Sequence, residues 1–289
     1  MRFTFFVVCA FLLISLPRLE SYSEEQKIMQ IHTAQSFVKT NKDVQASLHM
    51  IKQRKIQTAY QEEDWSLVWH DEFSQDALNP NHWNTEQWAS EKNQELQYYH
   101  PKNVAVTDGK LQIISKKEND NGRKYTSGAI HSKDLVHFQY GKVEMRAKLP
   151  TGKGVFPAFW MMPNKEDTWL PEIDIVEMLG DEPEKVWMTQ HWLDEEETLR
   201  SRSDTYVGDN FSKDYHTFGI EWTPHEIKWF IDGEEQFYSH TSVPSESMYL
   251  YINTAIGGEW PGRPDATTRF PQTFSVDYVR IYQKTEVNP

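Results

Sequence analysis

Apolar and polar residues alternate along much of the chain beyond residue 65. Residues 143–149 place Val, Met, Ala and Leu at every second position with charged residues between them, and residues 227–231 alternate in the same way. A period of two is typical of a β-strand with one buried face. Asp232-Gly233 follows the second run directly and favours a tight hairpin turn. The pattern predicts a strand at each place and a hairpin after Ile231.

The same pattern of apolar and polar residues extends almost to the end of the chain. Short apolar or alternating runs recur at 111–114 and 279–281, turn residues separate the runs, and no long helical pattern interrupts them. Many short strands over roughly 220 residues without a repeat period indicate one all-β sandwich rather than a propeller or an α/β fold. We expect a single all-β domain at residues 63–285, followed by a tail at 286–289.

Two segments of different character precede this domain. Residues 3–16 form an apolar run behind Met1-Arg2 that is shorter than the roughly 20 residues of a membrane span and is typical of a secretory signal. We therefore expect a signal peptide at 1–21, with an uncleaved membrane anchor as the alternative, and a secreted or cell-envelope-associated protein. Residues 22–62 are polar and lack Gly and Pro, which favours a helical spacer over a helix that docks on another surface.

The net charge disfavours some classes of partner, and the cysteine content excludes some kinds of chemistry. The chain has 30 Lys and Arg against 43 Asp and Glu, and a net charge of −13 disfavours nucleic acids and anionic membrane surfaces. Its single cysteine, Cys9, lies in the predicted signal peptide. The mature chain is therefore expected to lack disulfides, cysteine-bound zinc and a thiol nucleophile. The net charge leaves a neutral or cationic partner as the easier one to accommodate.

Three acids occur close together within one apolar segment. Glu172 and Asp174 would share a face of a regular strand, whereas Glu177 would point to the opposite face. A β-bulge near Ile175-Val176 would return Glu177 to the same face. Neighbouring carboxylates raise one another's pKa, and this cost indicates a function: calcium binding, or glycoside hydrolysis by two carboxyls about 5–5.5 Å apart. An exposed edge strand with solvated acids is the structural alternative.

The segment Glu172-Ile-Asp-Ile-Val-Glu177 resembles the E-I-D-I-x-E signature of glycoside hydrolase family 16, in the bulged form of its laminarinase-like members. Further blocks in the order typical of the family cover residues 65–283. They are Trp69-His-Asp-Glu-Phe73, Asn93-Gln-Glu-Leu-Gln-Tyr-Tyr99, Pro157-Ala-Phe-Trp160-Met, His216-Thr-Phe-Gly-Ile-Glu-Trp222, Gly257-Gly-Glu-Trp260-Pro-Gly262, Phe270-Pro271 and Val276-Asp277-Tyr-Val-Arg-Ile-Tyr282.

This resemblance implies a β-jelly roll of two curved antiparallel sheets with an open concave cleft, and so cleavage within a polysaccharide chain. It implies that Glu172 is the nucleophile, Glu177 the acid/base and Asp174 the assistant between them, with net retention of configuration. Catalysis by carboxyls requires no cofactor, and a monomer is the default for an enzyme of this kind.

The resemblance also suggests residues that bind the sugar. Trp160, Trp169 and Trp260 offer flat apolar faces to a pyranose, with core packing as the alternative for each. His191 is expected near the cleaved bond in a hydrogen-bonding role rather than as a metal ligand. Asn93 belongs to a block whose asparagine touches sugar hydroxyls in relatives.

Three further positions match a structural calcium site of several family members. Glu72, Gly109 and Asp277 would supply carboxylate and backbone oxygens, which Ca²⁺ prefers. The alternative is that Glu72 and Asp277 pair with basic residues.

The substrate is predicted less sharply than the reaction. The Gly257–Gly262 block favours β-1,3-glucan, with mixed-linkage β-1,3-1,4-glucan, galactans and transglycosylation as alternatives and a catalytically silent polysaccharide-binding protein as a remote one. Ala129 stands where relatives often carry an arginine, which leaves the linkage preference open.

Overall fold

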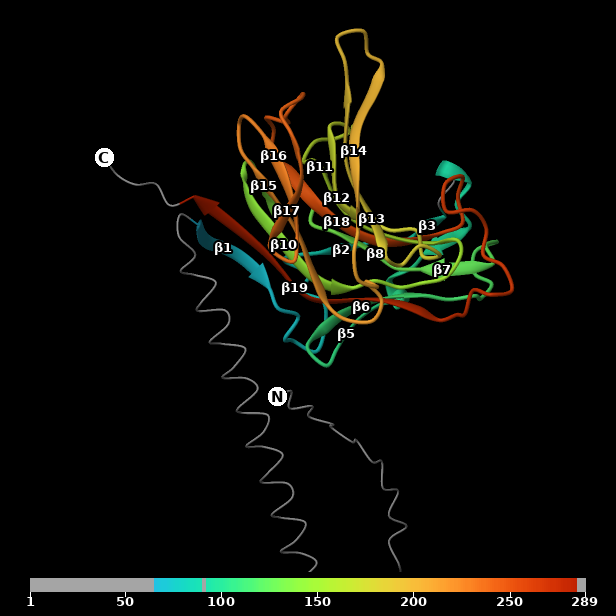
Figure 1. The fold of residues 1–289 in the computed structure, drawn as a ribbon. Helices are drawn as coiled ribbons and strands as arrows, with labels where there is room; N and C mark the ends of the chain where they lie inside the picture. The colour runs from blue at the N-terminus through green and yellow to red at the C-terminus, as the bar shows by residue number, and fades with distance from the viewer. Residues whose placement is uncertain (1–64, 90–91, 285–289) are drawn as a thin grey trace, which may run out of the picture. The chain divides into compact units, whose positions relative to one another are not determined.

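The structure is a computed structural model, and it describes residues 65–89 and 92–284. These residues form two eight-stranded sheets and one three-stranded sheet, with only short 3₁₀ helices (Figure 1). This confirms the predicted all-β jelly roll. The signal peptide at 1–21, the spacer at 22–62 and the tail at 286–289 lie outside the described residues. Within those residues, no helix is long and apolar enough to cross a membrane.

The first large sheet contains the C-terminal strand near its centre. Its order is β17-β16-β15-β10-β19-β6-β5, and β1 also pairs with β19. The bounds are β1 (Trp65–Asp71), β5 (Val104–Thr107), β6 (Lys110–Ser115), β10 (Gly141–Lys148), β15 (His216–Trp222), β16 (Ile227–Ile231), β17 (Glu234–Ser239) and β19 (Gln272–Lys284).

The second large sheet carries the three clustered acids. Its order is β14-β13-β12-β11-β18-β8-β2, and β9 also pairs with β18. The bounds are β2 (Asn84–Thr85), β8 (Ala129–His131), β9 (His137–Phe138), β11 (Val155–Pro163), β12 (Glu172–Glu177), β13 (Lys185–Leu193), β14 (Leu199–Val207) and β18 (Met248–Ile256).

A small third sheet stands beside the second. It joins β3 (Trp88–Ala89), β4 (Gln97–Tyr99) and β7 (Tyr125–Ser127), and the pairing of β4 with β7 is parallel. The 3₁₀ helices η2 (Lys92–Gln94) and η3 (Pro101–Asn103) flank β4. This sheet therefore places residues from the first third of the domain beside the second sheet, which carries the clustered acids.

The predicted alternation is confirmed in detail. Val143, Met145 and Ala147 are fully buried in β10, and the charged residues between them face outward. The run 227–231 forms β16, and Asp232-Gly233 connects it to β17 as a hairpin. The inner faces of the two large sheets bury one continuous apolar core, whose burial supplies the main driving force for the fold.

The two acids of the predicted calcium site each have an arginine partner. Glu72 is buried and accepts two hydrogen bonds from Arg280, from Nε at 2.8 Å and from a terminal nitrogen at 3.2 Å. Asp277 accepts from Arg146 at 2.9 Å. A cation bound by these carboxylates would lie beside two guanidinium groups, so the donor set fits ion pairs better than Ca²⁺. The calcium site at Glu72, Gly109 and Asp277 stays a prediction.

Candidate active site

Strand β12 contains one residue more than its neighbours. On the β11 side, Asp174 faces Trp160 and Val176 faces Phe159, which leaves Ile175 without a partner residue. On the β13 side, the register likewise shifts between Asp174 and Glu177. This is the β-bulge that the sequence predicted, and it reverses the alternation once.

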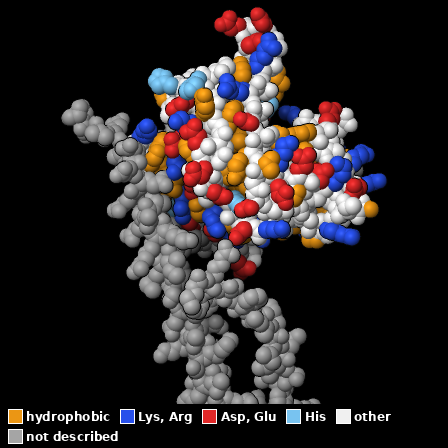
Figure 2. Space-filling view, in the orientation of Figure 1, with side chains coloured by type: hydrophobic (Ala, Val, Ile, Leu, Met, Phe, Trp, Pro, Cys, Tyr) orange, Lys and Arg blue, Asp and Glu red, His pale blue; other side chains and the backbone are white. Residues whose placement is uncertain are grey.

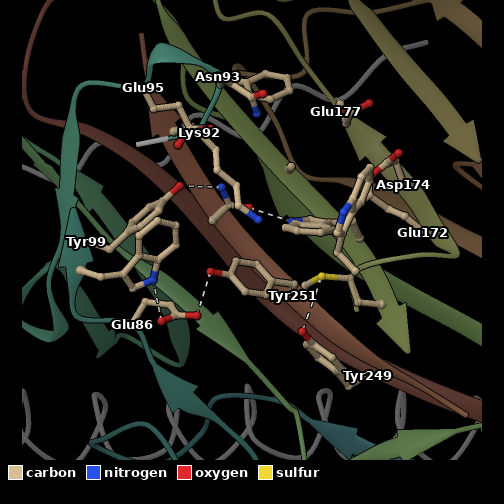
Figure 3. Close-up of a pocket in the computed structure, with 18 residues that line it drawn as sticks. Glu86, Lys92, Asn93, Glu95, Tyr99, Glu172, Asp174, Glu177, Tyr249 and Tyr251 are labelled. Atoms are coloured by element: carbon tan, nitrogen blue, oxygen red, sulfur yellow. Dashed lines mark hydrogen bonds between the residues drawn. The ribbon is translucent and has the colours of Figure 1, made fainter. Parts of the chain in front are cut away.

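The bulge brings all three acids to one cavity. Glu172, Asp174 and Glu177 line a space of about 420 Å³ on the outer face of the second sheet (Figure 3). The intervening Ile173, Ile175 and Val176 are buried among the core residues. The strand therefore satisfies both requirements of its sequence, because its apolar residues pack inward and its acids face the cavity.

A tryptophan of the other sheet holds the bulge from behind. Trp229 lies in β16 and is fully buried, and its Nε1 donates a hydrogen bond of 2.9 Å to the backbone carbonyl of Asp174. A buried carbonyl without a partner is costly, so this contact stabilises the irregular backbone at that point. It also connects the position of the acids directly to the packing between the sheets.

Burial raises the pKa of all three carboxyls. For Glu177, burial acts first and the charge of Asp174 second, and together they raise the pKa well above its ordinary value. For Glu172, burial, Asp174 and Glu177 raise the pKa, while Lys92 lowers it. Burial also raises the pKa of Asp174, against the opposing effect of His191. The cluster therefore favours a protonated carboxyl more than three separated acids would.

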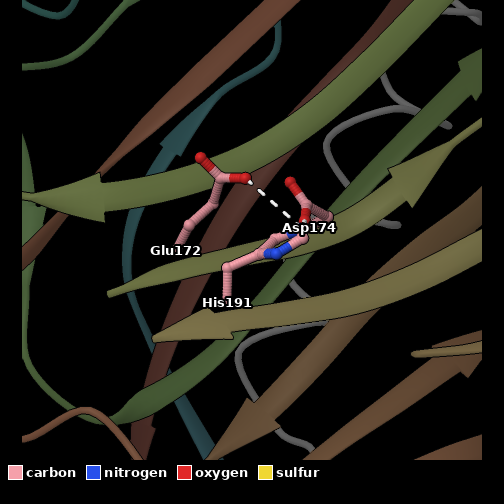
Figure 4. A group of neighbouring side chains, drawn as sticks. All are labelled: Glu172, Asp174 and His191. Carbon is pink, nitrogen blue, oxygen red and sulfur yellow. Dashed lines mark ion pairs between the residues drawn. The ribbon is translucent and has the colours of Figure 1, made fainter. Parts of the chain in front are cut away.

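His191 lies on the neighbouring strand, where the sequence placed it. Its Nε2 is 3.4 Å from Asp174 Oδ2 and 3.8 Å from Glu172 Oε1 (Figure 4). The ligand atoms of these three residues lie within 4.8 Å of one another, a set that could also hold a metal ion. His191 thus lies beside two of the acids, and its hydrogen-bonding role near the cleaved bond stays a prediction.

The far part of the cavity is built around a fourth carboxylate. Glu86 follows β2, and its two oxygens accept from Trp88 Nε1 at 2.7 Å and from Tyr251 Oη at 3.0 Å. The edge of the Trp88 ring packs on Tyr99, with the ring centroids 5.4 Å apart. Trp88 is 37% exposed although its ring has these two contacts and its backbone pairs with β4. The result is a fixed indole that faces solvent.

A second chain of hydrogen bonds fixes Trp160. Its Nε1 donates to Asn253 Oδ1 at 2.9 Å, and Asn253 Nδ2 donates to Tyr99 Oη at 2.9 Å. The Trp160 ring also contacts Tyr251, with the centroids 4.7 Å apart. Trp160 thus lines the cavity and is held in place by its neighbours, which combines the two alternatives that the sequence left open.

The loop that carries Asn93 is attached to the Gly257-Gly258 segment. Glu259 N–H donates to Asn93 O at 2.8 Å, and Gln94 Nε2 donates to Glu259 Oε1 at 2.8 Å. Gly257 has a φ of 73°, and a Cβ there would lie 2.5 Å from the side chain of Leu96. Two blocks far apart in sequence therefore meet, and they bring Asn93 and Lys92 to the cavity.

Six of the eight predicted active-site residues line the cavity. They are Asn93, Trp160, Trp169, Glu172, Asp174 and Glu177, and His191 contacts two of the acids. Trp260 is not among the lining residues. Its ring is 47% exposed and packs on Phe156 and Trp187.

The residues that β18 and the small sheet contribute to the cavity were not predicted from the sequence. Residues 249–253 read Tyr-Leu-Tyr-Ile-Asn, and this alternation places Tyr249, Tyr251 and Asn253 on the cavity face. The period of two was the available signal for β18. No local signal marks Glu86 or Trp88, because their role depends on a strand more than 160 residues away.

The geometry can be compared with known proteins. The family model "Glycosyl hydrolases family 16" matches residues 92–280, which include the bulged strand and the acids. The chain belongs to this family. A second model, "Beta-glucan synthesis-associated protein SKN1/KRE6/Sbg1", matches residues 2–167 and ends before the first acid of β12.

Individual relatives agree with this assignment. The chain is 36% identical to glucan endo-1,3-beta-glucosidase A1 of Niallia circulans over 76% of its own length and 38% of that protein. It is 35% identical to a beta-glucanase of Rhodothermus marinus, over 77% of the chain and 86% of that enzyme. The laminarinase catalytic domain of Thermotoga maritima superposes with a TM-score of 0.72 at 37% identity, over 78% of this chain and 100% of that domain.

Removing the hydrogen bond behind the bulge should affect stability and turnover together. We expect Trp229→Phe to lower the free energy of unfolding by about 2 kcal/mol, because the Asp174 carbonyl loses its buried donor. The variant should also lose activity on a β-glucan. Trp222→Phe is the matched control, since its buried Nε1 donates to the Pro244 carbonyl away from the acids. Equal loss of activity per folded molecule in both variants would contradict a role for Trp229 in positioning.

The raised pKa of Glu177 makes stability fall as pH increases. Above an ordinary pKa of about 4.5, the unfolded chain releases this proton while the folded chain retains it, so each further pH unit favours unfolding until the folded pKa is passed. We expect Glu177→Gln to melt at a higher temperature than wild type at pH 8 and at a similar temperature at pH 4. Glu195→Gln, at an exposed hairpin tip, should change neither value. A Glu177→Gln melt that is unaltered at pH 8 would contradict the buried-acid account.

Proposed function

We propose that the protein is an exported, retaining endo-β-1,3-glucanase that cleaves its substrate by double displacement at Glu172 and Glu177. The observation that carries this proposal is the bulged strand, which presents a buried aspartate and two half-buried glutamates to one aromatic-lined cavity. Export is supported by the apolar run at residues 3–16.

In the first step, a Glu172 carboxylate oxygen bonds to the anomeric carbon and the glycosidic C–O bond breaks. Glu177 gives its proton to the departing oxygen at the same time. In the second step, Glu177 takes a proton from water, the water oxygen bonds to the anomeric carbon, and the Glu172 ester bond breaks. Two inversions give net retention.

The electrostatics of the cluster support the presence of a protonated acid near neutral pH. The acid needs a proton near neutral pH, and burial together with the Asp174 charge raises the pKa of Glu177 in that direction. The nucleophile must be ionised. Burial and the neighbouring acids raise the pKa of Glu172 as well, and Lys92 opposes this shift, as His191 does at Asp174. Asp174 lies between the two glutamates in the strand, and its Oδ2 is 3.4 Å from His191 Nε2. This place suits a residue that positions the two glutamates.

The cavity lining favours a neutral sugar chain. Trp88, Trp160, Trp169 and Tyr251 offer ring faces or edges to pyranoses, whereas Lys92 is the one Lys or Arg among the lining residues. Ala129, at the position where the family often has an arginine, is buried, and its carbonyl accepts the backbone N–H of Glu86. The Glu86 carboxylate accepts hydrogen bonds from Trp88 and Tyr251, and His131 Nε2 lies 3.6 Å from it.

Product analysis on two substrates tests the proposal directly. We expect the full chain to degrade laminarin into oligosaccharides and to release the β-anomer first, as a retaining mechanism requires. Activity confined to mixed-linkage barley glucan would identify a lichenase instead. Oligosaccharides longer than the starting material would indicate transglycosylation, and binding without cleavage would contradict the enzymatic proposal.

Trp88 should contribute to substrate binding rather than to chemistry. We expect Trp88→Ala to reduce kcat/KM on laminarin about tenfold, mostly through KM, because an aromatic side chain that the substrate covers only in part contributes about 1.5 kcal/mol. On an aryl glucoside too short to reach Trp88, the rate should stay within about twofold of wild type. Tyr238→Ala is the control, since this tyrosine is 49% exposed on β17 of the other sheet. A loss confined to kcat would argue against a binding role.

A further inference from the structure

Strand β14 forms an unpaired outer edge of the second sheet. All nine of its residues pair with β13 without a register shift, and no other strand in the described part of the chain pairs with it. Eight of the nine residues are exposed. Figure 1 shows the β13–β14 hairpin rising from the body of the domain, and Figure 2 shows charged side chains of both signs gathered at its end.

An edge of this kind is unusual for a protein that stays alone. Natural edge strands are commonly kept short, bulged, or interrupted by proline or charged residues, because their free N–H and C=O groups otherwise pair with another chain. β14 is long and regular and lacks Pro, and its charged residues, Arg200, Arg202 and Asp204, are of both signs. It also exposes apolar side chains at both ends, with Leu199 51% and Val207 68% exposed.

The sequence of β14 is complementary to itself. If two copies pair antiparallel with Ser203 opposite Ser203, each residue meets a suitable partner: Leu199 with Val207, Arg200 with Tyr206, Ser201 with Thr205, and Arg202 with Asp204. Apolar pairs, hydroxyl pairs and opposite charges at directly facing positions all stabilise neighbouring strands.

Neighbouring registers are much poorer. Moving the centre by one residue places Arg202 opposite Arg202 or Asp204 opposite Asp204, and centring on Ser201 places Arg200 opposite Arg202. Like charges at facing positions are destabilising. The strand therefore specifies one arrangement rather than general adhesion.

Arg202 and Asp204, whose charges distinguish the possible registers, can pair with a second copy. Arg202 lies over the Phe237 ring at 5.8 Å, and Asp204 accepts only the adjacent Thr205 N–H, so neither has an ion pair among the residues that the structure describes. Arg200 differs, since it donates to Asp194 at 2.6 Å in its own hairpin. The charge argument thus rests on Arg202 and Asp204.

We propose that a second copy of this chain pairs with β14 to form a two-fold dimer centred on Ser203, in place of the monomer expected by default. Such an interface is isologous and joins the second sheets of the two copies into one continuous sheet. Ser201 and Ser203 lie opposite His191 and Thr189 of β13, on the cavity face. A two-fold axis perpendicular to the sheet therefore opens both clefts on the same side.

Sedimentation velocity of the full chain from about 1 to about 100 μM, a range that covers micromolar affinities, tests the dimer with a charge swap. Wild type should shift from monomer to dimer as concentration rises. Arg202→Asp and Asp204→Arg should each remove the dimer, because each places like charges face to face. The double variant, Arg202→Asp with Asp204→Arg, should restore it. Lys213→Asp, an exposed change of equal charge on a loop, should behave as wild type.

Three results would overturn the proposal. They are a wild-type chain that stays monomeric throughout, single variants that dimerise like wild type, and a double variant that remains monomeric. Hydrogen exchange of the β14 N–H groups that do not bond to β13 adds a fourth: protection of these groups that does not change with concentration would mean that something other than a second copy covers the edge. Catalytic activity of both single variants should match wild type at low concentration, which shows that the variants fold.

Discussion

The single extra residue in β12 is the constraint on which the site depends. A regular strand would bury one of the three carboxyls in the apolar core between the sheets, where an unpaired charge is very costly. The bulge at Ile175 avoids this and turns Glu177 toward the cavity. The irregular backbone is in turn held by the Trp229 hydrogen bond from the opposite sheet. The site geometry is thus a consequence of the core packing.

The second feature is electrostatic. Three acids side by side raise one another's pKa, and their burial strengthens the effect because the charged forms lose water. The same arrangement that costs stability at neutral pH favours the protonated carboxyl that the proposed mechanism needs. Lys92 and His191 approach the cluster from the side of Glu172 and Asp174, which gives the two glutamates different environments.

The sequence was sufficient wherever the information is local. The strands at 141–148 and 227–231, the hairpin at Asp232-Gly233 and the bulge between Asp174 and Glu177 follow from residue spacing within a few positions. Contacts between distant segments could not be read in this way. Glu86 acquires its role from Tyr251, and Glu72 is paired with Arg280, more than 200 residues away.

The same limit applies to single aromatic residues. Trp160 and Trp169 line the cavity, whereas Trp260 lies outside it against Trp187, although the sequence predicted a sugar contact for all three. Composition and neighbouring residues indicate that a tryptophan is available for sugar contact. Which surface its ring faces depends on the registers of β11, β13 and β18, and these are set by the whole sheet.

The most direct test of the account is to identify the glycosyl azides formed by two variants with an activated aryl β-glucoside and sodium azide. Removal of the nucleophile in Glu172→Gly leaves one displacement by azide and should give the α-glycosyl azide. Removal of the acid/base in Glu177→Ala leaves the glycosyl-enzyme open to azide and should give the β-glycosyl azide. The opposite pairing of products, or the same anomer from both variants, would contradict the roles assigned to Glu172 and Glu177.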